Sequence, residues 1–204
     1  MMILTIALPK GRLAEETVEI LIKCGIDCRD ILQPTRKLEL FDKSGNFRFI
    51  FVKPSDVPTY VEHGVADMGV CGKDTLLEED KNILEMLDLK FGRCKLCIAG
   101  FDSNYPDNLR VATKYTNIAK KLFRNKAINA DIIKLNGSIE LGPIIGLSDV
   151  ILDVVESGKT IKENGLKVLE EIYDCSARLV VNMVSLRLKQ NVIKPLITAI
   201  ERAI

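Results

Sequence analysis

The sequence predicts an α/β protein, because short apolar runs typical of buried strands alternate with segments whose apolar residues recur at helical spacing. Strands that are separated by helices usually pair in parallel, in a sheet that the helices cover. The chain has 204 residues, and a typical domain has about 100 to 150. We therefore expect one large domain or two small lobes.

The first half of the chain predicts short elements in close succession. Residues 13–24 place apolar side chains on one face and acidic side chains on the other, as an amphipathic helix does. The turn-rich residues 42–46 join two apolar runs and predict a hairpin, and Gly64 is expected to end a helix. The expected elements are, in order, a strand at 2–8, a helix at 13–24, strands at 37–41 and 47–52, a helix at 57–63, a strand at 66–71, a helix that starts after 72–74, and mostly strands over 83–98.

The second half follows residues 102–108, where several turn residues in succession break the pattern and suggest a lobe boundary nearby. The expected elements are a strand at 109–113, a helix at 117–127, a strand at 131–135, a short helix at 139–145, a strand at 149–155, a helix from about 159, strands at 167–173 and 178–184, and a last helix at 185–203. The core face of the last helix is expected to carry Leu186, Val192, Ile193, Leu196, Ile197 and Ile200.

Composition and charge exclude several classes of protein. The chain is 47% hydrophobic and 28% charged, and 29 Lys and Arg against 28 Asp and Glu leave a net charge of +1. A near-neutral chain without basic tracts is not expected to bind nucleic acid or an anionic membrane. No apolar run reaches the roughly 20 residues that span a bilayer, and no basic segment precedes the apolar residues 2–8, so we expect a cytoplasmic protein.

Cysteine and histidine offer little catalytic or metal chemistry. The six cysteines lie mostly in apolar segments and are expected to be reduced core thiols. Cys94 and Cys97 would point to opposite faces of a strand, which argues against a joint metal or redox site. The single histidine, His63, is expected at the surface near a helix end, and one histidine excludes multi-histidine zinc sites.

Residues 149–166 contain the most informative candidate for a ligand site. An apolar strand ends in a short polar loop that opens a helix, so backbone N–H groups and the positive helix end would meet there, which suits a phosphate. Position 153 is aspartate where a P-loop needs glycine, so Walker-type binding is not expected. Asp153 suits ribose hydroxyls, and Ser157, Gly158 and Thr160 suit a phosphate. The alternative is a capped helix after a strand, with no ligand.

Cations near the N-terminus form a second candidate site. Lys10, Gly11 and Arg12 stand between the first strand and the first helix, where ligands of α/β proteins usually bind. Lysine and the fork-shaped arginine suit a polyphosphate, although a solvated basic turn would have the same sequence. Arg36 is a further candidate cation. Glu140, near a helix start, is either a capping acid or a group that binds the adenine or ribose side of a nucleotide.

Four segments together resemble the short form of the ATP phosphoribosyltransferase family. They are LPKGR at 8–12, KPSDVPTYVEHGVADMGVCGKD at 53–74, VATKYTNIAKK at 111–121 and LNGSIELGPIIGLSDVILDVVESGKTIKENGL at 135–166. The resemblance implies two lobes with mixed β-sheets flanked by helices, similar to class II periplasmic binding proteins, with the active site in the cleft. It implies a lobe I of residues 1–92 and 178–204, and a lobe II of residues 93–177 that holds the loop for phosphoribosyl pyrophosphate (PRPP).

The resemblance also implies roles for individual residues. The PRPP-binding residues would be Asp153, Glu156, Ser157, Gly158, Lys159, Thr160 and Ile161. The ATP-binding residues would be Lys10, Gly11, Arg12, Gly72, Asp74 and Glu140. The catalytic cations would be Lys10, Arg12 and Arg36, which would face the ATP phosphates or the leaving pyrophosphate. Lys159 stands where the family usually has a second threonine or a small residue, and it adds a charge near the phosphate.

The implied reaction is the first step of histidine biosynthesis. N1 of ATP would attack C1′ of PRPP and expel pyrophosphate, with Mg²⁺ bound through PRPP and pyrophosphate and with no metal site of the protein itself. The short form implies a homodimer of this chain and a regulatory subunit similar to histidyl-tRNA synthetase, together as a hetero-octamer. Two alternatives stay open: a phosphoribosyltransferase that uses another base, and a noncatalytic two-lobed solute-binding protein.

Overall fold

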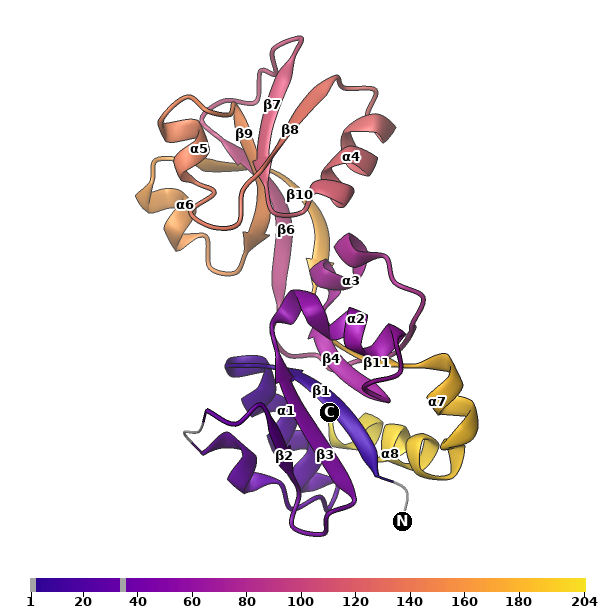
Figure 1. The fold of residues 1–204 in the computed structure, drawn as a ribbon. Helices are drawn as coiled ribbons and strands as arrows, with labels where there is room; N and C mark the ends of the chain where they lie inside the picture. Colours follow the sequence, from indigo (N-terminus) through magenta and orange to yellow (C-terminus); the bar gives the residue numbers. More distant parts are fainter. Residues whose placement is uncertain (1–2, 34–35) are drawn as a thin grey trace. The chain divides into compact units, whose positions relative to one another are not determined.

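The computed structural model describes residues 3–33 and 36–204 and divides the chain into two compact units (Figure 1). Unit 1 comprises Met1–Gly92 and Ser176–Ile204, and unit 2 comprises Arg93–Cys175. The chain therefore passes between the units twice. The second passage comes two residues before the expected lobe end at residue 177, because Ala177 already begins a strand of unit 1.

Unit 1 is built on a six-stranded sheet in the order β2-β3-β1-β4-β11-β5. Its strands are β1 (Leu4–Pro9), β2 (Glu39–Phe41), β3 (Phe47–Val52), β4 (Met68–Gly72), β5 (Leu84–Asp88) and β11 (Ala177–Val181). β3, β1 and β4 are parallel, as strands that alternate with helices should be. β2, β11 and β5 add antiparallel pairs, so the sheet is mixed, and the hairpin expected around residues 42–46 is confirmed.

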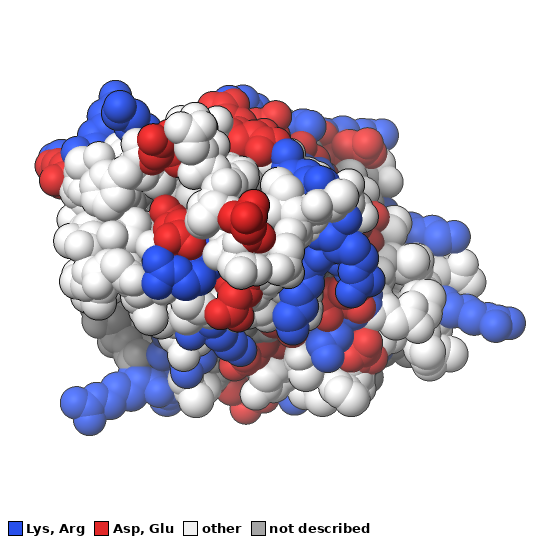
Figure 2. Space-filling view, turned by 90° about the horizontal axis from the view of Figure 1, so that it is seen from above, with Lys and Arg blue, Asp and Glu red and all other residues white. Residues whose placement is uncertain are grey.

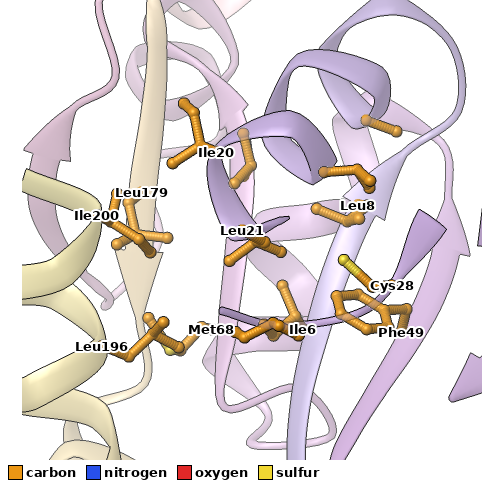
Figure 3. Packing of buried hydrophobic residues seen from close by; sticks show 14 of the residues in the cluster. Ile6, Leu8, Ile20, Leu21, Cys28, Phe49, Met68, Leu179, Leu196 and Ile200 are labelled. Carbon is orange, nitrogen blue, oxygen red and sulfur yellow. The ribbon is translucent and has the colours of Figure 1, made fainter. Parts of the chain in front are cut away.

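Helices cover both faces of this sheet. They are α1 (Arg12–Lys23), α2 (Val57–Glu62), α3 (Lys73–Glu79), α7 (Met183–Leu188) and α8 (Gln190–Ala203), with short 3-10 turns η1 (Arg29–Leu32) and η2 (Pro54–Asp56). Side chains alternate along β1, so that Ile6 and Leu8 pack with α1 and α8 while Ala7 packs with α2 on the other face. Figure 3 shows the core cluster that contains Ile6 and Leu8. In this cluster Leu21 of α1 and Ile200 of α8 pack against the strands.

The C-terminal region differs from the expected strand at 178–184 and single helix at 185–203. β11 ends before Asn182, whose side chain accepts the Ser185 N–H at 2.9 Å and so starts α7 early. The helix is interrupted at Lys189, between α7 and α8.

The positions of Lys189 and Val192 were not predicted from the sequence. The Lys189 ammonium donates to the carboxylate of the buried Asp67 at 2.7 Å, which binds the break between α7 and α8 to the start of β4. Val192 is 38% exposed, so its expected place on the core face was wrong. Ile193, Leu196, Ile197 and Ile200 fill that face instead, and Leu186 packs against it.

Unit 2 is built on a five-stranded sheet in the order β10-β6-β9-β7-β8. Its elements are β6 (Cys94–Gly100), β7 (Leu109–Thr113), α4 (Thr116–Asn125), β8 (Ala130–Lys134), α5 (Leu141–Ile144), β9 (Val150–Val155), α6 (Lys159–Glu163) and β10 (Lys167–Cys175). β9, β7 and β8 are parallel, and β6 and β10 are antiparallel to their neighbours. The lobe boundary expected near residues 102–108 was wrong, because this loop joins β6 and β7 of one sheet.

The surface agrees with the near-neutral composition. On the face that Figure 2 shows, basic and acidic side chains are interspersed and not gathered into a region of one sign. Within the described ranges, no helix combines the length and the apolar character that a membrane span requires.

Candidate functional site

Three parallel strands of unit 1 end at one edge of its sheet. Pro9 of β1 is paired with Val52 of β3, and Ile6 of β1 is paired with Met68 of β4. Lys10, Lys53 and Gly72 therefore stand together at the carboxyl edge, where α/β sheets usually bind ligands. Lys53 opens the segment 53–74 that resembles the family, but no individual role was assigned to it from the sequence; the parallel pairing of β1 with β3 places it beside Lys10.

Lys10, Gly11 and Arg12 form the turn from β1 into α1, and all three are exposed. Gly11 has a φ of 97°, a left-handed conformation that favours glycine. The Arg12 guanidinium lies 3.6 Å from Glu16 on the next helical turn. Arg12 is thus paired with an acidic residue of its own helix, and Lys10 is exposed at the edge of the sheet.

A depression of about 180 Å³ lies beside this turn, within unit 1. Its polar lining includes Lys10, Glu15 and Lys37. Its remaining lining is Gly11, Ala14, Ile31, Leu32, Gln33 and Phe51. An apolar wall with cations at its rim suits a base or sugar that carries phosphates. Arg36, which precedes Lys37, is exposed in the loop that leads to β2.

The third part of this edge is the turn from β4 into α3. Gly72 precedes the helix, and Asp74 lies in its first turn. A Cβ at Gly72 would lie only 2.1 Å from Asp74 Oδ1, so the carboxylate is folded over the glycine. An acidic group therefore lies close to the Gly72 backbone, at the N-terminal end of α3.

Ion pairs with residues of β5 and β11 stabilise the turn between β4 and α3. Lys73 Nζ donates to Glu85 of β5 at 2.6 Å, and Arg178 of β11 lies 3.3 Å from Glu85 and 3.5 Å from Asp88. Burial acts to raise the pKa of Asp88, but hydrogen bonds from Ser176 and Lys90, and the Arg178 charge, lower that pKa well below its usual range. Asp88 is therefore a carboxylate that the folded chain holds ionised.

In unit 2 the corresponding edge carries the loop between β9 and α6. Gly158 has a φ of 72° and turns the chain into the helix, and the Lys159 N–H donates to Ser157 Oγ at 3.4 Å. Ser157, Lys159 and Thr160 are exposed, as is Glu156. The N–H groups of a first helical turn have no acceptor within the helix, and the contact of the Lys159 N–H with Ser157 Oγ is long, so an anion could replace it.

Ile161 takes a different place from the rest of the loop. Its side chain is 5% exposed and packs in a core cluster with Ile139, Ile151 and Leu166. Of this residue, only the backbone can therefore face a ligand. The side chain anchors α6 to the sheet and holds the loop in position.

Asp153, within β9, meets Lys114, which directly follows β7. Lys114 Nζ lies 3.8 Å from Asp153 Oδ1 and 4.7 Å from the centre of the Tyr115 ring. Asp153 Oδ1 also accepts the Val154 N–H at 2.8 Å. Lys114 lies in the segment 111–121 that resembles the family, but it too was assigned no role from the sequence; the parallel pairing of β7 with β9 brings it to Asp153.

The remaining candidates stand apart from these two edges or add little to them. Glu140, expected to bind ATP, directly precedes α5 of unit 2, whereas the other expected ATP-binding residues belong to unit 1. His63 is exposed at the end of α2. Within residues 3–33 and 36–204, no three His, Cys, Asp or Glu side chains gather as a metal site would require.

Comparison with known proteins identifies the family. The family model for ATP phosphoribosyltransferase (HisG) matches residues 53–202. The ATP phosphoribosyltransferase of Caldanaerobacter subterraneus is 52% identical over 99% of this chain and 98% of its own length. That of Lachnoclostridium phytofermentans is 54% identical over 95% of this chain and 94% of its own length.

Solved structures agree with the fold. The ATP phosphoribosyl transferase (HisG:HisZ) complex from Thermotoga maritima has a chain that is 35% identical, with a TM-score of 0.86 over 98% of both chains. A BvgS VFT2 domain from Bordetella pertussis matches with a TM-score of 0.60 at 13% identity, over 98% of this chain and 86% of its own, and shows the fold alone. The predicted periplasmic-binding-protein-like fold is confirmed, and the chain belongs to the ATP phosphoribosyltransferase family.

Proposed function

We propose that this chain transfers the 5-phosphoribosyl group of PRPP to N1 of ATP and releases pyrophosphate, the first step of histidine biosynthesis. The observation that carries the proposal is identity above 50% with ATP phosphoribosyltransferases over nearly the whole chain. The two strand edges add chemical support, because one offers an anion-binding loop with a carboxylate and the other offers cations beside an apolar depression.

The loop of unit 2 would bind PRPP. The N–H groups at Gly158, Lys159 and Thr160 would hold the 5′-phosphate, and the Asp153 carboxylate would accept hydrogen bonds from the ribose hydroxyls. A carboxylate beside a polyanion is unfavourable, and Lys114 offsets that repulsion from 3.8 Å away. Glu156 would complete the contact with the ribose.

The edge of unit 1 would bind ATP and the leaving group. Lys10, Arg12 and Arg36 would stabilise charge on the ATP phosphates or on the departing pyrophosphate, and Lys53 joins them as a further candidate. Gly11, Gly72 and Asp74 would position the nucleotide. The resemblance also assigns Glu140, a residue of unit 2, to ATP. No protein nucleophile is needed, because the adenine nitrogen attacks C1′ directly and the site works by alignment and charge stabilisation.

Mg²⁺ would accompany PRPP. This ion prefers oxygen ligands and commonly binds through substrate phosphates. Asp153 of β9 and Glu156 of the loop would be the groups that contact the ion or its water shell. Bound Mg²⁺ would neutralise charge on the pyrophosphate as it leaves.

A regulatory subunit would assemble with this chain. The Thermotoga maritima structure is titled as a HisG:HisZ complex. The 0.86 TM-score to that chain supports a hetero-oligomer with a regulatory subunit here. The family resemblance further implies a homodimer of this chain and a histidyl-tRNA-synthetase-like subunit, together as a hetero-octamer. Activity of the chain alone is then a separate question from its chemistry.

The test is an assay for pyrophosphate. Purified chain is mixed with Mg²⁺, PRPP and ATP, with pyrophosphatase present, and phosphate release is followed. Omission of ATP, or its replacement by adenine or orotate, provides the controls. Release that requires ATP supports the proposal, and release with another base in place of ATP would favour a different phosphoribosyltransferase.

The regulatory subunit completes the test. If the chain alone releases no phosphate, the assay is repeated with the synthetase-like subunit. Absence of phosphate release in the presence of that subunit would refute the proposed reaction and favour the solute-binding alternative. PRPP binding by calorimetry then distinguishes a binding protein from an inactive preparation.

A further inference from the structure

Two cysteines face each other where the chain enters and leaves unit 2. Cys94 is the first residue of β6, Cys175 is the last residue of β10, and the antiparallel register of these strands pairs the two directly. Directly opposite residues of such a pair point to the same face, with Cα atoms about 4.5 to 5.5 Å apart. A disulfide requires a Cα separation of about 4.4 to 6.8 Å. The backbone therefore already has the spacing that a disulfide needs, although both residues are thiols in the structure.

No other pair of cysteines has this relation among the strand pairings of the described residues. Cys97, on the same strand as Cys94, is paired with Glu171 on one side and Asp153 on the other. Cys71 of β4 is paired with Arg178. The juxtaposition is thus specific to the two ends of the β6–β10 pair.

The exposure of the two thiols differs in a way that suits stepwise oxidation. Cys94 is partly exposed, whereas Cys175 is 3% exposed directly across the ladder. A reagent in solution would reach Cys94 first, and Cys175 would be the neighbouring thiol that resolves the intermediate. Elsewhere in the strands, burial and the nearby Glu171 charge raise the pKa of Cys97 to about 11, which makes that thiol a poor competitor.

We propose that Cys94 and Cys175 are a redox modification site that closes reversibly into an intramolecular disulfide. A small disulfide such as glutathione disulfide would be the oxidant. The Cys94 thiolate attacks it, forms a mixed disulfide and releases one glutathione thiolate. The Cys175 thiol passes its proton to a glutathione thiolate and attacks the Cys94 sulfur, which releases the second glutathione. Two protein thiols are oxidised, and one glutathione disulfide is reduced to two thiols.

The disulfide would form where the chain passes between the two units, and we expect it to affect activity. The chain passes between the units at residues 92–93 and again at residues 175–176. On the unit 1 side the Ala177 N–H donates to the Phe91 carbonyl at 2.9 Å, and on the unit 2 side Cys94 is paired with Cys175. A disulfide would join the two passages covalently on the unit 2 side and prevent the ends of β6 and β10 from separating there. Oxidation is expected to lower turnover, and this effect on activity rests on the proposed function, whereas the disulfide does not.

Counting thiols tests the modification. The full chain is equilibrated in glutathione buffers of rising disulfide content, thiols are counted after denaturation, and peptides are mapped by mass. We expect loss of two of the six thiols as one Cys94–Cys175 crosslink, which dithiothreitol reverses. The matched control Cys97→Ser should form the same crosslink, and Cys94→Ser and Cys175→Ala should form none. Retention of all six thiols, a lasting glutathione adduct on Cys94 beside a reduced Cys175, or a crosslink at other cysteines would overturn the proposal.

Assays on the same samples test the consequence. Turnover of the wild type should fall in proportion to the crosslinked fraction and recover with dithiothreitol, while Cys94→Ser should keep its turnover throughout. Unchanged turnover of fully crosslinked chain would overturn the effect on activity. A reduced chain that is inactive with the regulatory subunit would count against the proposed reaction alone, because the thiol count is read without any assay.

Discussion

Gly72 and Gly158 are required for different physical reasons. Gly72 has an ordinary φ of −69°, but a Cβ there would lie 2.1 Å from Asp74 Oδ1. Gly158 has open space, with Val155 Cγ1 at 3.8 Å, but its φ of 72° disfavours any residue with a side chain. Gly72 is therefore needed to leave room for the Asp74 carboxylate, and Gly158 is needed because the turn requires a positive φ.

Replacing Gly72 with alanine should displace the Asp74 carboxylate and weaken ATP binding. A lost hydrogen bond to a charged group costs about 1.5 to 3 kcal/mol, so KM for ATP should rise by about tenfold or more. Steady-state kinetics with ATP varied would measure the change. Gly137→Ala is the matched control, because a Cβ there meets nothing within 4 Å. An unchanged KM for ATP in Gly72→Ala would remove Asp74 from the ATP site.

Thr160 tests the phosphate loop. The side chain is exposed in the first turn of α6, where a bulky apolar group would obstruct the approach of a phosphate. Thr160→Leu should raise KM for PRPP by about tenfold or more, with a smaller effect on ATP, because a charge-assisted hydrogen bond is lost. Thr160→Ser should restore PRPP affinity. Normal PRPP affinity in the leucine variant would argue against the loop as the phosphate site.

At the scale of elements, parallel strands place side chains that are distant in sequence at one edge. β7 and β9 bring Lys114 to Asp153, and β1 and β3 bring Lys10 near Lys53. Tyr115 is buried beneath Lys114, and its N–H donates to Thr113 Oγ1 at 2.8 Å. The end of β7 is thus rigid enough to hold the lysine beside the loop.

Removing the Lys114 charge should weaken PRPP binding moderately. An ion pair of this exposure contributes at most about 1 kcal/mol, so Lys114→Ala should raise KM for PRPP by about twofold to fivefold. The difference should shrink at high salt, which screens the charge. Lys114→Arg should retain affinity, and Lys120→Ala on the exposed face of α4 should change nothing. An effect of equal size in Lys120→Ala would show that net charge, and not position, was responsible.

Asp88 should make stability depend on pH at the end of β5. Its folded pKa lies below the value of about 3.9 that it has in an unfolded chain, so its stabilisation is complete above that pH and is lost as the pH falls further. Asp88→Asn should cost about 1 to 2 kcal/mol at pH 7, because hydrogen bonds to a charged group are weakened.

Melting temperatures measured between pH 2 and pH 7 would test this dependence. The gap between wild type and Asp88→Asn should narrow below about pH 4, where the carboxyl takes up a proton in the unfolded chain while it stays ionised in the folded chain. Asp107→Asn, in the exposed loop before β7, provides the control and should follow the wild type. A gap that stays constant down to the lowest pH would contradict the ionised role of Asp88.

At the scale of the whole molecule, the two units differ in how the chain builds them. Unit 2 is one continuous segment with its own sheet and core cluster. Unit 1 is discontinuous, and β11 from the C-terminal segment lies between β4 and β5 in its sheet. Unit 1 therefore depends on both ends of the chain.

A fragment of residues 93–175 should fold alone, whereas residues 1–92 should not. The second fragment lacks β11 and α8, so β4 and β5 lose their common partner and the core face against α1 is uncovered. Circular dichroism during heating should show a cooperative transition for the first fragment only. Adding a peptide of residues 176–204 to the second fragment should restore structure if the missing pairing is the cause. Cooperative melting of residues 1–92 without that peptide would contradict the argument.

Local sequence patterns predicted part of the candidate site. The turns at Lys10–Arg12 and at Ser157–Thr160 were predicted from the sequence, because each is a short polar or glycine-containing segment between a strand and a helix. The site roles of their residues remain predictions. The split at Lys189 was missed, because it depends on Asp67 far away in the chain.

The sequence by itself determined the α/β class, the order of nearly all elements and the family, because periodicity, turn residues and extended motifs are properties of neighbouring residues. Only the tertiary structure decided that β11 lies between β4 and β5, that Lys114 meets Asp153 and that Cys94 faces Cys175. These contacts join strands that are distant along the chain. Their register is selected by the packing of whole sheets, and no short stretch of sequence contains that information.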